Sequence, residues 1–308
     1  MNFISNIKYL YKELPYILKR NKINGHCLDI CAENKKVNIF QYHPEKIFSY
    51  VQNPYNLGDS LGEVIVKYLL DSKGIDMDAN VSRTKHFNCV GSNIFSSYQD
   101  ATIWGSGANP QFPTRKQMFC QKISRRKLDV RAVRGPLTRK LLLNMGYNCP
   151  EIYGDPAILM PLIYNPISQK KRKYIVIPQF QQEINLRNQY PEEYIVSMNT
   201  NDYKFVIDQI VSSEIVYTSS LHGIILAESY GVPAVFFRRL KHISRPESNV
   251  NFKFYDYYQS TGRESFPRGE SFEEAKKLDP PSLPKLNSLV QGLLDTFPYD
   301  LWEVDVKN

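Results

Sequence analysis

Short apolar segments alternate with helical segments along most of this chain, and no other feature of the sequence limits the fold as strongly. Strands that alternate with helices imply parallel sheets, with the loops gathered at the carboxyl ends of the strands. The predicted strands are Ile47–Val51, Ala101–Trp104, Val130–Val133, Tyr174–Ile177, Glu214–Tyr217 and Ala234–Phe237. The predicted helices are Ser60–Leu70, Pro136–Met145, Asp202–Val211, Leu221–Tyr230 and residues 283–296, whereas residues 244–280 are predicted to be irregular.

The alternation is interrupted at residues 164–172, a polar and basic stretch that contains Asn165 and Pro166. At about 150 residues per domain, a chain of 308 residues suggests two domains or one large one. We therefore predict an α/β protein with two Rossmann-like domains that face a cleft, at residues 46–165 and 172–300, and a peripheral N-terminal segment at 1–45. Ligands of open parallel sheets bind beyond the carboxyl ends of the strands, so the cleft is the expected site.

The chain carries 39 Lys and Arg against 31 Asp and Glu, which gives a net charge of +8. This excess predicts an anionic partner: nucleic acid, a membrane surface, or a phosphorylated or carboxylated substrate. The positive residues are dispersed and no DNA- or RNA-binding signature appears, which argues against nucleic acid. No apolar run approaches the roughly 18 residues of a membrane span.

The N-terminal segment has apolar residues at helical spacing among lysines, from Ile4 to Leu18. One interpretation is a surface helix packed on the main body, and the other is a basic amphipathic helix that rests on a membrane. Pro15 interrupts the pattern and favours the packed helix.

The five cysteines are an odd number, are scattered and form no CxxC pair. Neither a disulfide framework nor a zinc site is therefore expected. This usage predicts a reduced, cytoplasmic protein, with the inner face of the membrane as a further possible location. Asp59 and Asp155 do not form a recognisable metal site, and neither a metal nor a cofactor is expected.

The most informative cluster is Thr218-Ser219-Ser220-Leu221-His222-Gly223, which follows a predicted strand and opens a helix. Backbone N–H groups at such a turn, together with the helix dipole, favour an anion. Ser219 and Ser220 are therefore candidate binding residues. His222 can exchange protons near neutral pH, although a histidine that only caps the helix start is the alternative.

A second cluster, Arg131 to Pro136, lies where a predicted strand ends and a predicted helix begins. Arg134 is the residue of this cluster that we expect to hold a phosphate or carboxylate. The third cluster is Asn56-Leu57-Gly58-Asp59, in which Asn56 is a candidate for binding substrate. Asp59 is either a helix N-cap or a group that takes a proton from a substrate hydroxyl. These segments are read directly from the sequence.

Three further segments complete the candidates. Gly105, Ser106 and Gly107 form a small-residue turn that allows close backbone approach. Asp155, in Gly154-Asp155-Pro156, is interpreted as a structural turn residue. Arg238 and Arg239 end a predicted strand and are expected near the cleft.

In their order and spacing, these motifs resemble the polysaccharide pyruvyl transferase family, particularly its ketal-forming exopolysaccharide members. The segments that carry the resemblance are Asn56–Asp59, Trp104–Gly107, Val133–Thr138, Tyr153–Ala157, Ser219–Gly223 and Gly231–Pro233. The resemblance implies a fold like that of B-type glycosyltransferases, phosphoenolpyruvate as donor and co-substrate, and a sugar of a glycan, often lipid-linked, as acceptor.

By resemblance, His222 is the acid, Arg134 holds the anionic groups of the donor, and Asp59 orients or deprotonates the acceptor hydroxyl. Several family members carry a donor-binding arginine directly before the Leu-His pair, where this chain has Ser220. Arg238 or Arg239 is the predicted substitute. The resemblance thus implies a pyruvyltransferase that forms a ketal on a cell-surface polysaccharide or its lipid-linked precursor and releases phosphate.

Two other function classes are weighed against this one. A sugar-nucleotide-dependent glycosyltransferase could use the same fold and the same helix N-terminus. A basic protein that binds nucleic acid or a membrane is the alternative of another class, and it predicts steeply salt-dependent binding to generic duplex.

Overall fold

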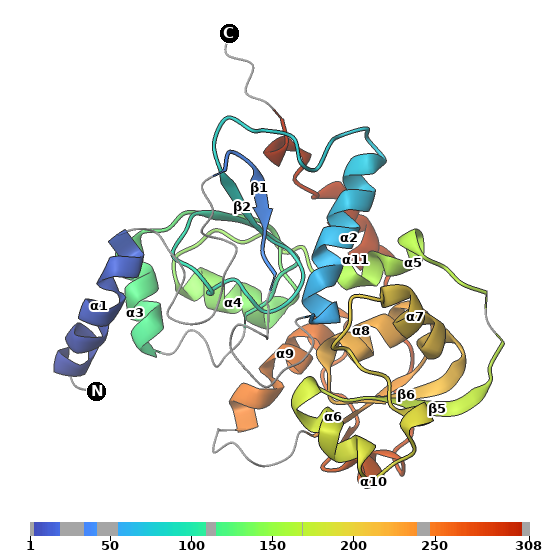
Figure 1. Cartoon of the computed structure of the whole chain (residues 1–308). Helices are drawn as coiled ribbons and strands as arrows, with labels where there is room; N and C mark the ends of the chain where they lie inside the picture. The colour runs from blue at the N-terminus through green and yellow to red at the C-terminus, as the bar shows by residue number, and fades with distance from the viewer. Residues whose placement is uncertain are drawn as a thin grey trace.

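The computed structural model describes residues 3–18, 34–41, 55–108, 115–167, 169–238 and 247–303 (Figure 1). Its strands form two four-stranded parallel sheets, one in each half of the chain. The predicted α/β class with parallel sheets is therefore confirmed. The predicted strand Ile47–Val51 lies outside the described residues.

The first sheet has the order β1-β2-β3-β4. Its strands are β1 (Val37–Ile39), β2 (Lys85–Asn88), β3 (Ala101–Trp104) and β4 (Leu128–Ala132). Strand β3 is buried along its whole length, as its apolar sequence predicts for a central strand. The loops that follow β2, β3 and β4 leave the sheet at the same edge, because all three strands are parallel.

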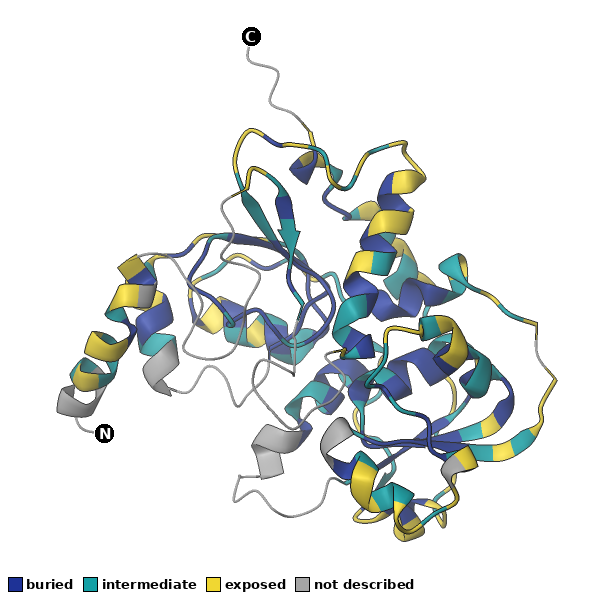
Figure 2. Cartoon of the chain, viewed as in Figure 1, coloured by how far each residue is buried: buried dark blue, intermediate teal, exposed yellow. Residues whose placement is uncertain are grey.

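The second sheet has the order β5-β6-β7-β8. Its strands are β5 (Arg172–Ile177), β6 (Ser213–Thr218), β7 (Ala234–Phe237) and β8 (Arg268–Gly269). Helix α8 (Leu221–Ser229) follows β6, and nearly all of its residues are buried, as the dark blue ribbon in Figure 2 shows. An enclosed helix of this kind fixes the residues at its first turn.

The remaining helices are α2 (Leu57–Asp71), α3 (Arg115–Ser124), α4 (Pro136–Asn144), α5 (Met160–Ile163), α6 (Phe180–Arg187), α7 (Tyr203–Val211), α9 (Glu247–Ser260), α10 (Phe272–Ala275) and α11 (Asn287–Asp295), with a short 3-10 helix η2 (Pro156–Leu159). Of these, α2, α4, α7 and α11 correspond to predicted helices, and the sequence did not predict the others. Helix α2 begins three residues before Ser60, so that predicted start is wrong. Asn56 is the N-cap, and Asp59 lies inside the first turn instead of capping it.

The prediction that residues 244–280 are irregular is also wrong, because this range contains α9, β8 and α10. Phe254, Tyr257 and Tyr258 of α9 are buried, and they recur at the three- and four-residue spacing of a helix face. These aromatic side chains are the buried face of the helix.

Helix α1 (Phe3–Leu18) packs on α3, which confirms the surface-helix interpretation. Ile17, Tyr98 and Cys120 form a small core between them, and the Tyr98 hydroxyl donates to Glu13 Oε2 at 3.1 Å. Among the described residues, no helix combines the length and the apolar character needed to cross a bilayer.

The two halves meet at η2, which contacts α2, α8 and α11. The chain then returns from the second half to the first sheet, where Trp104 Nε1 donates to Leu293 O at 2.9 Å. Phe297 and Trp302 stack on each other and meet Phe87 of β2 edge-on. The segment around η2 is therefore held on several sides, which gives Asp155, the residue before it, a fixed position.

Candidate functional site

The site forms where the first turns of α2 and α8 approach each other. A Cβ atom at position 58 would overlap with the imidazole of His222, so the first turn of α2 accommodates this ring only because residue 58 is glycine. The His222 side chain is 12% exposed. The His222 ring thus extends from the first turn of α8 to the first turn of α2, and both helix ends carry N–H groups without intrahelical partners.

Asp155 lies on the other side of the His222 ring. Its Oδ1 accepts a hydrogen bond from Ala157 N at 3.1 Å and caps η2, in agreement with the structural interpretation. Its Oδ2 faces His222 Nε2 at 3.7 Å. Both of these atoms are buried and have no hydrogen-bond partner among the described residues.

Asp59 and Asn56 belong to the same end of α2 as Gly58. Asn56 Nδ2 donates to Asp59 Oδ2 at 3.1 Å. Gly91, at φ +100°, passes so close that a Cβ atom there would overlap with Asp59 Oδ1. The structure therefore brings Asn56, Asp59 and His222 together, as the candidate site requires.

A buried thiol lies beside the two carboxylates. Burial raises the pKa of the Cys89 thiol to about 12, and the charges of Asp155 and Asp59 act in the same direction. At neutral pH this cysteine is therefore a neutral thiol rather than a nucleophilic thiolate. Among the described residues, no group of three or more His, Cys, Asp and Glu side chains could hold a metal ion.

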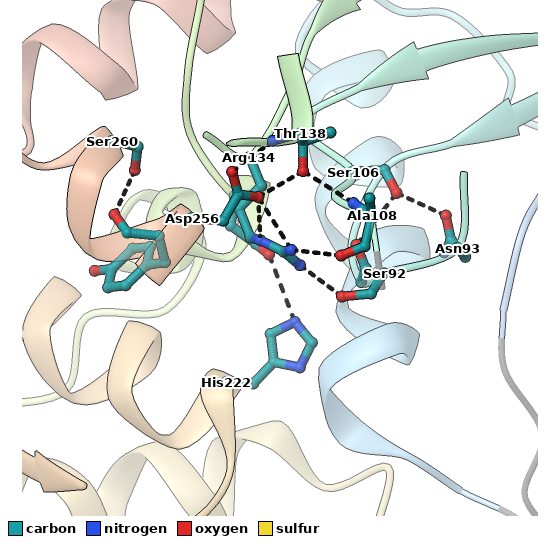
Figure 3. A network of polar contacts seen from close by, with 12 residues as sticks. Ser92, Asn93, Ser106, Ala108, Arg134, Thr138, His222, Asp256 and Ser260 are labelled. Atoms are coloured by element: carbon teal, nitrogen blue, oxygen red, sulfur yellow. Dashed lines mark hydrogen bonds and ion pairs between the residues drawn. The ribbon is translucent and has the colours of Figure 1, made fainter. Parts of the chain in front are cut away.

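Arg134 is fully buried and is bonded to protein groups on several sides (Figure 3). Its guanidinium donates to Asp256 Oδ2 at 3.1 Å, to Ser92 Oγ at 2.6 Å and to Ala108 O at 2.9 Å. Asp256 in turn accepts from Thr138 N and from Thr138 Oγ1, at 2.9 and 2.6 Å. Arg134 thus joins the loops after β3 and β4 to α9, and its contact with the donor stays a prediction.

The Gly105-Ser106-Gly107 turn approaches protein groups closely. Gly105 has φ +78°, and a Cβ atom there would overlap with Pro156. A Cβ atom at Gly107 would overlap with the Arg134 guanidinium. Ser106 Oγ, also buried, donates to Asn93 Oδ1 at 2.7 Å. The close approach that these small residues permit is packing against Pro156 and Arg134, and a ligand contact by this turn stays a prediction.

The second half contributes the remaining candidates. Ser219 is buried and its Oγ accepts from Gln179 N at 2.8 Å. Ser220 is the N-cap of α8, with no side-chain capping bond to the described residues. Arg238, directly after β7, pairs through Nη1 with Glu270 Oε2 at 2.8 Å and keeps a side chain that is 20% exposed. Arg239 lies outside the described residues.

Sequence reasoning missed two of the contacts that define the site. The first is the contact between Asp155 and His222, which are far apart in the chain. The second is the contact between Arg134 and Asp256, and Asp256 belongs to the helix whose range was predicted to be irregular. A signal was present in both cases. Gly154-Asp155-Pro156 places a carboxylate at a tight turn, and the aromatic spacing around Asp256 is that of a helix.

Two known proteins are similar to this chain. "Uncharacterized protein L143" of Acanthamoeba polyphaga mimivirus is 25% identical over 232 residues, which cover 72% of this chain and 77% of that protein. The crystal structure of an uncharacterized protein from Klebsiella pneumoniae subsp. pneumoniae NTUH-K2044 superposes on this chain with a TM-score of 0.42 and 14% sequence identity. The match covers 84% of this chain and 98% of the Klebsiella chain.

The sequence profile of the family described as polysaccharide pyruvyl transferase matches residues 56–241. That range contains every motif from Asn56 to Gly231-Val232-Pro233 and confirms the resemblance stated from them. Because the match spans more than half of the chain, the protein belongs to the polysaccharide pyruvyl transferase family and is an enzyme that transfers a pyruvyl group to a polysaccharide.

Proposed function

We propose that the donor is phosphoenolpyruvate and that the enzyme forms a pyruvate ketal on a sugar of a cell-surface polysaccharide or of its lipid-linked precursor, with release of phosphate. The observation that carries this proposal is the position of the His222 imidazole, which extends from the first turn of α8 to the first turn of α2. A proton donor there stands beside N–H groups suited to an anion, and phosphoenolpyruvate combines a protonatable carbon with two anionic groups.

The anionic groups of the donor are placed at the two helix N-termini. The backbone of α8 begins after Ser220, whose hydroxyl makes no capping bond to the described residues and can face a phosphate or carboxylate. Arg238, at the end of β7, supplies the charge that the arginine before the Leu-His pair supplies in other family members. Its side chain is partly exposed, whereas that of Arg134 is completely buried.

The reaction can be written with the residues of this site. His222 gives a proton to the methylene carbon, so a C–H bond forms and the adjacent carbon becomes cation-like. One sugar hydroxyl adds to that carbon, with Asp59 accepting its proton. The C–O bond to phosphate then breaks, and a second hydroxyl closes the cyclic ketal. The two sugar hydroxyls release two protons. One of them, in net terms, restores the proton that His222 gave, and the other leaves with the phosphate.

We further propose that the two sheets are the two walls of one cleft, in an arrangement like that of B-type glycosyltransferases. Residues 46–165 would form the acceptor side and residues 172–300 the donor side, with residues 1–45 peripheral to both. The acceptor is membrane-bound if it is lipid-linked. We therefore place the enzyme in the cytoplasm at the inner face of the membrane, where its net positive charge favours anionic lipid.

The test is a product assay with phosphoenolpyruvate and a panel of lipid-linked glycans, read by mass and by phosphate release. The wild-type protein is expected to add pyruvate as a ketal to one of these glycans. The His222→Asn variant should lose this activity while its unfolding midpoint is unchanged. His86→Asn is the matched control, because His86 lies on β2, in the first half of the chain.

Other outcomes of the same assay reject the proposal. Nucleotide release from a sugar nucleotide, without phosphate release from phosphoenolpyruvate, would show the glycosyltransferase alternative. Full activity in the His222→Asn variant would remove this histidine from the reaction.

A further inference from the structure

We propose that Asp155 is the positioning residue for His222: its free oxygen holds the Nε2–H side of the imidazole, so that the other nitrogen, Nδ1, gives the proton to the donor. The kinetic part of this inference rests on the proposed function. The geometric part, which concerns the orientation and the tautomer of one ring, stands on the structure alone.

Two buried polar atoms face each other across the site. Asp155 Oδ2 and His222 Nε2 are 3.7 Å apart, and neither has a hydrogen-bond partner among the described residues. Buried polar groups are costly to leave unpaired, and the great majority have a partner. One of these atoms is an acceptor and the other can carry a hydrogen, so a shift of less than about 1 Å joins them. Such bonds are often long in a free enzyme and tighten when the substrate binds.

The contact with His222 is separate from the structural role of Asp155. Asp155 caps η2 through Oδ1, which accepts a hydrogen bond from Ala157 N. The cap does not use Oδ2. Asn or Ser caps a helix about as well as Asp. A cap therefore explains one oxygen of the side chain, and it does not require a second oxygen that is buried and aimed at a histidine.

The His222 ring is also confined on its opposite side. His222 Nδ1 lies over Gly58, where any larger residue would overlap with it. The carboxylate of Asp155 at Nε2 and the first turn of α2 beside Nδ1 thus fix the ring from two sides. Nδ1 is the nitrogen at the helix end where the donor is proposed to bind. During the reaction the Nδ1–H bond breaks and the C–H bond of the new methyl group forms. Before this step the ring is an imidazolium with a hydrogen on each nitrogen, and after it the ring is neutral and keeps its Nε2–H toward Asp155.

The experiment uses Asp155→Asn in the full chain. The asparagine oxygen can still accept from Ala157 N, while an amide NH₂ replaces the oxygen that faces Nε2. Asp202→Asn is the matched control, because Asp202 Oδ1 caps α7 in the same way, accepting from Phe205 N, and its residue is exposed. Asp155→Ser is the second variant, since Ser also keeps a capping acceptor.

The first measurement is ¹⁵N NMR of the imidazole nitrogens without any substrate, with His222 assigned from the His222→Asn variant. We expect the neutral ring of the wild type and of Asp202→Asn to carry its hydrogen on Nε2, and the Asp155 variants to lose this preference. The second measurement is pyruvyl transfer. We expect kcat of Asp155→Asn to fall about 100-fold or more, with the KM for phosphoenolpyruvate within about twofold, because an orienting carboxylate acts on the proton transfer.

Each result decides the inference. An Nδ1–H tautomer in the wild type, an unchanged tautomer in Asp155→Asn, or a loss confined to KM would overturn it. If both Asp155 variants failed to fold, the structural cap would account for the residue and the inference would be rejected. If the wild-type protein transferred no pyruvate, the proposed function would fail, while the tautomer measurement would still decide the pairing of Asp155 with His222.

Discussion

Two buried pairs, each of one basic and one acidic residue, lie near the junction of the two halves. They differ in how many of their polar atoms are hydrogen-bonded. Arg134 and Asp256 are both 0% exposed, are 3.1 Å apart, and are surrounded by further hydrogen bonds. His222 and Asp155 are 3.7 Å apart, and each keeps one atom without a partner among the described residues. A saturated pair is suited to hold a fold together, whereas an unsaturated pair retains bonding capacity for a reaction.

The saturated pair connects segments that are distant in the chain. Asp256 comes from α9, and a Cβ atom at Gly135 would overlap with its backbone oxygen, so the glycine lets α9 come close to the loop after β4. Arg134 then joins this helix to the loop after β3 through Ala108 O. The pair is therefore expected to act on stability and the unsaturated pair on catalysis, and the following variants test that division.

The largest effect is expected for Asp256→Asn. This variant keeps the size of the side chain and removes the charge that compensates the buried Arg134 guanidinium. Loss of one partner of a buried ion pair costs about 3–5 kcal/mol, so urea unfolding should show a loss of that size. A loss below about 1 kcal/mol, together with a large fall in kcat, would contradict the assignment of this pair to the fold.

The second variant, Gly58→Ala, acts on the unsaturated pair. The added methyl group overlaps with the His222 ring. The ring must therefore leave its observed position, in which Nδ1 lies over the first turn of α2. We expect kcat for pyruvyl transfer to fall about 100-fold, which corresponds to about 2.7 kcal/mol, with a much smaller change in the free energy of unfolding.

Gly292→Ala is the control for this variant. Gly292 also lies within a helix, α11, and a Cβ atom there would meet only Ile152 Cγ2 at 3.3 Å. Its kcat should equal that of the wild type. Equal activity of Gly58→Ala and Gly292→Ala would show that His222 does not need its observed position.

The sequence predicts the strands β3 to β7, and it misses β1, β2, β8 and the start of α2. The buried strand β3 was predicted at its observed bounds, because four apolar or small residues before a glycine turn leave few alternatives. The start of α2 was missed because a distant group competes with the local capping signal at Ser60. Leu57 N donates to Met198 O at 2.9 Å, a contact that no local pattern contains.

The candidate site shows the same limit more sharply. The motif order indicated His222, Asp59 and Asn56, and the structure brings them to one helix end. The pairing of Arg134 with Asp256 could not be predicted, because α9 had been taken as irregular. Nor could the sequence show that Asp155 faces His222, since that facing depends on how η2 packs between α2 and α8.

The third variant, Arg238→Ala, tests the predicted substitute for the missing donor-binding arginine. If Arg238 contacts the donor, the KM for phosphoenolpyruvate should rise about tenfold, equivalent to about 1.4 kcal/mol, with little change in kcat. Arg268→Ala is a close control, because Arg268 contacts the same Glu270 carboxylate at 3.6 Å. A rise of equal size in both variants would point to Glu270, and no rise in Arg238→Ala would remove Arg238 from the donor site.

The smallest effect is expected for an exposed pair of the same charge types. Lys67 and Asp71 lie four residues apart on α2, 2.9 Å from each other, with side chains 60% and 56% exposed. Water and salt screen such a pair, so a double-mutant cycle with Lys67→Ala and Asp71→Ala should give a coupling of about 0.3–0.5 kcal/mol. Its distance is shorter than that of either buried pair. If the cycle nevertheless gave a coupling comparable with the loss in Asp256→Asn, distance rather than burial would govern these pairs, and the division drawn between the two buried pairs would lose its basis.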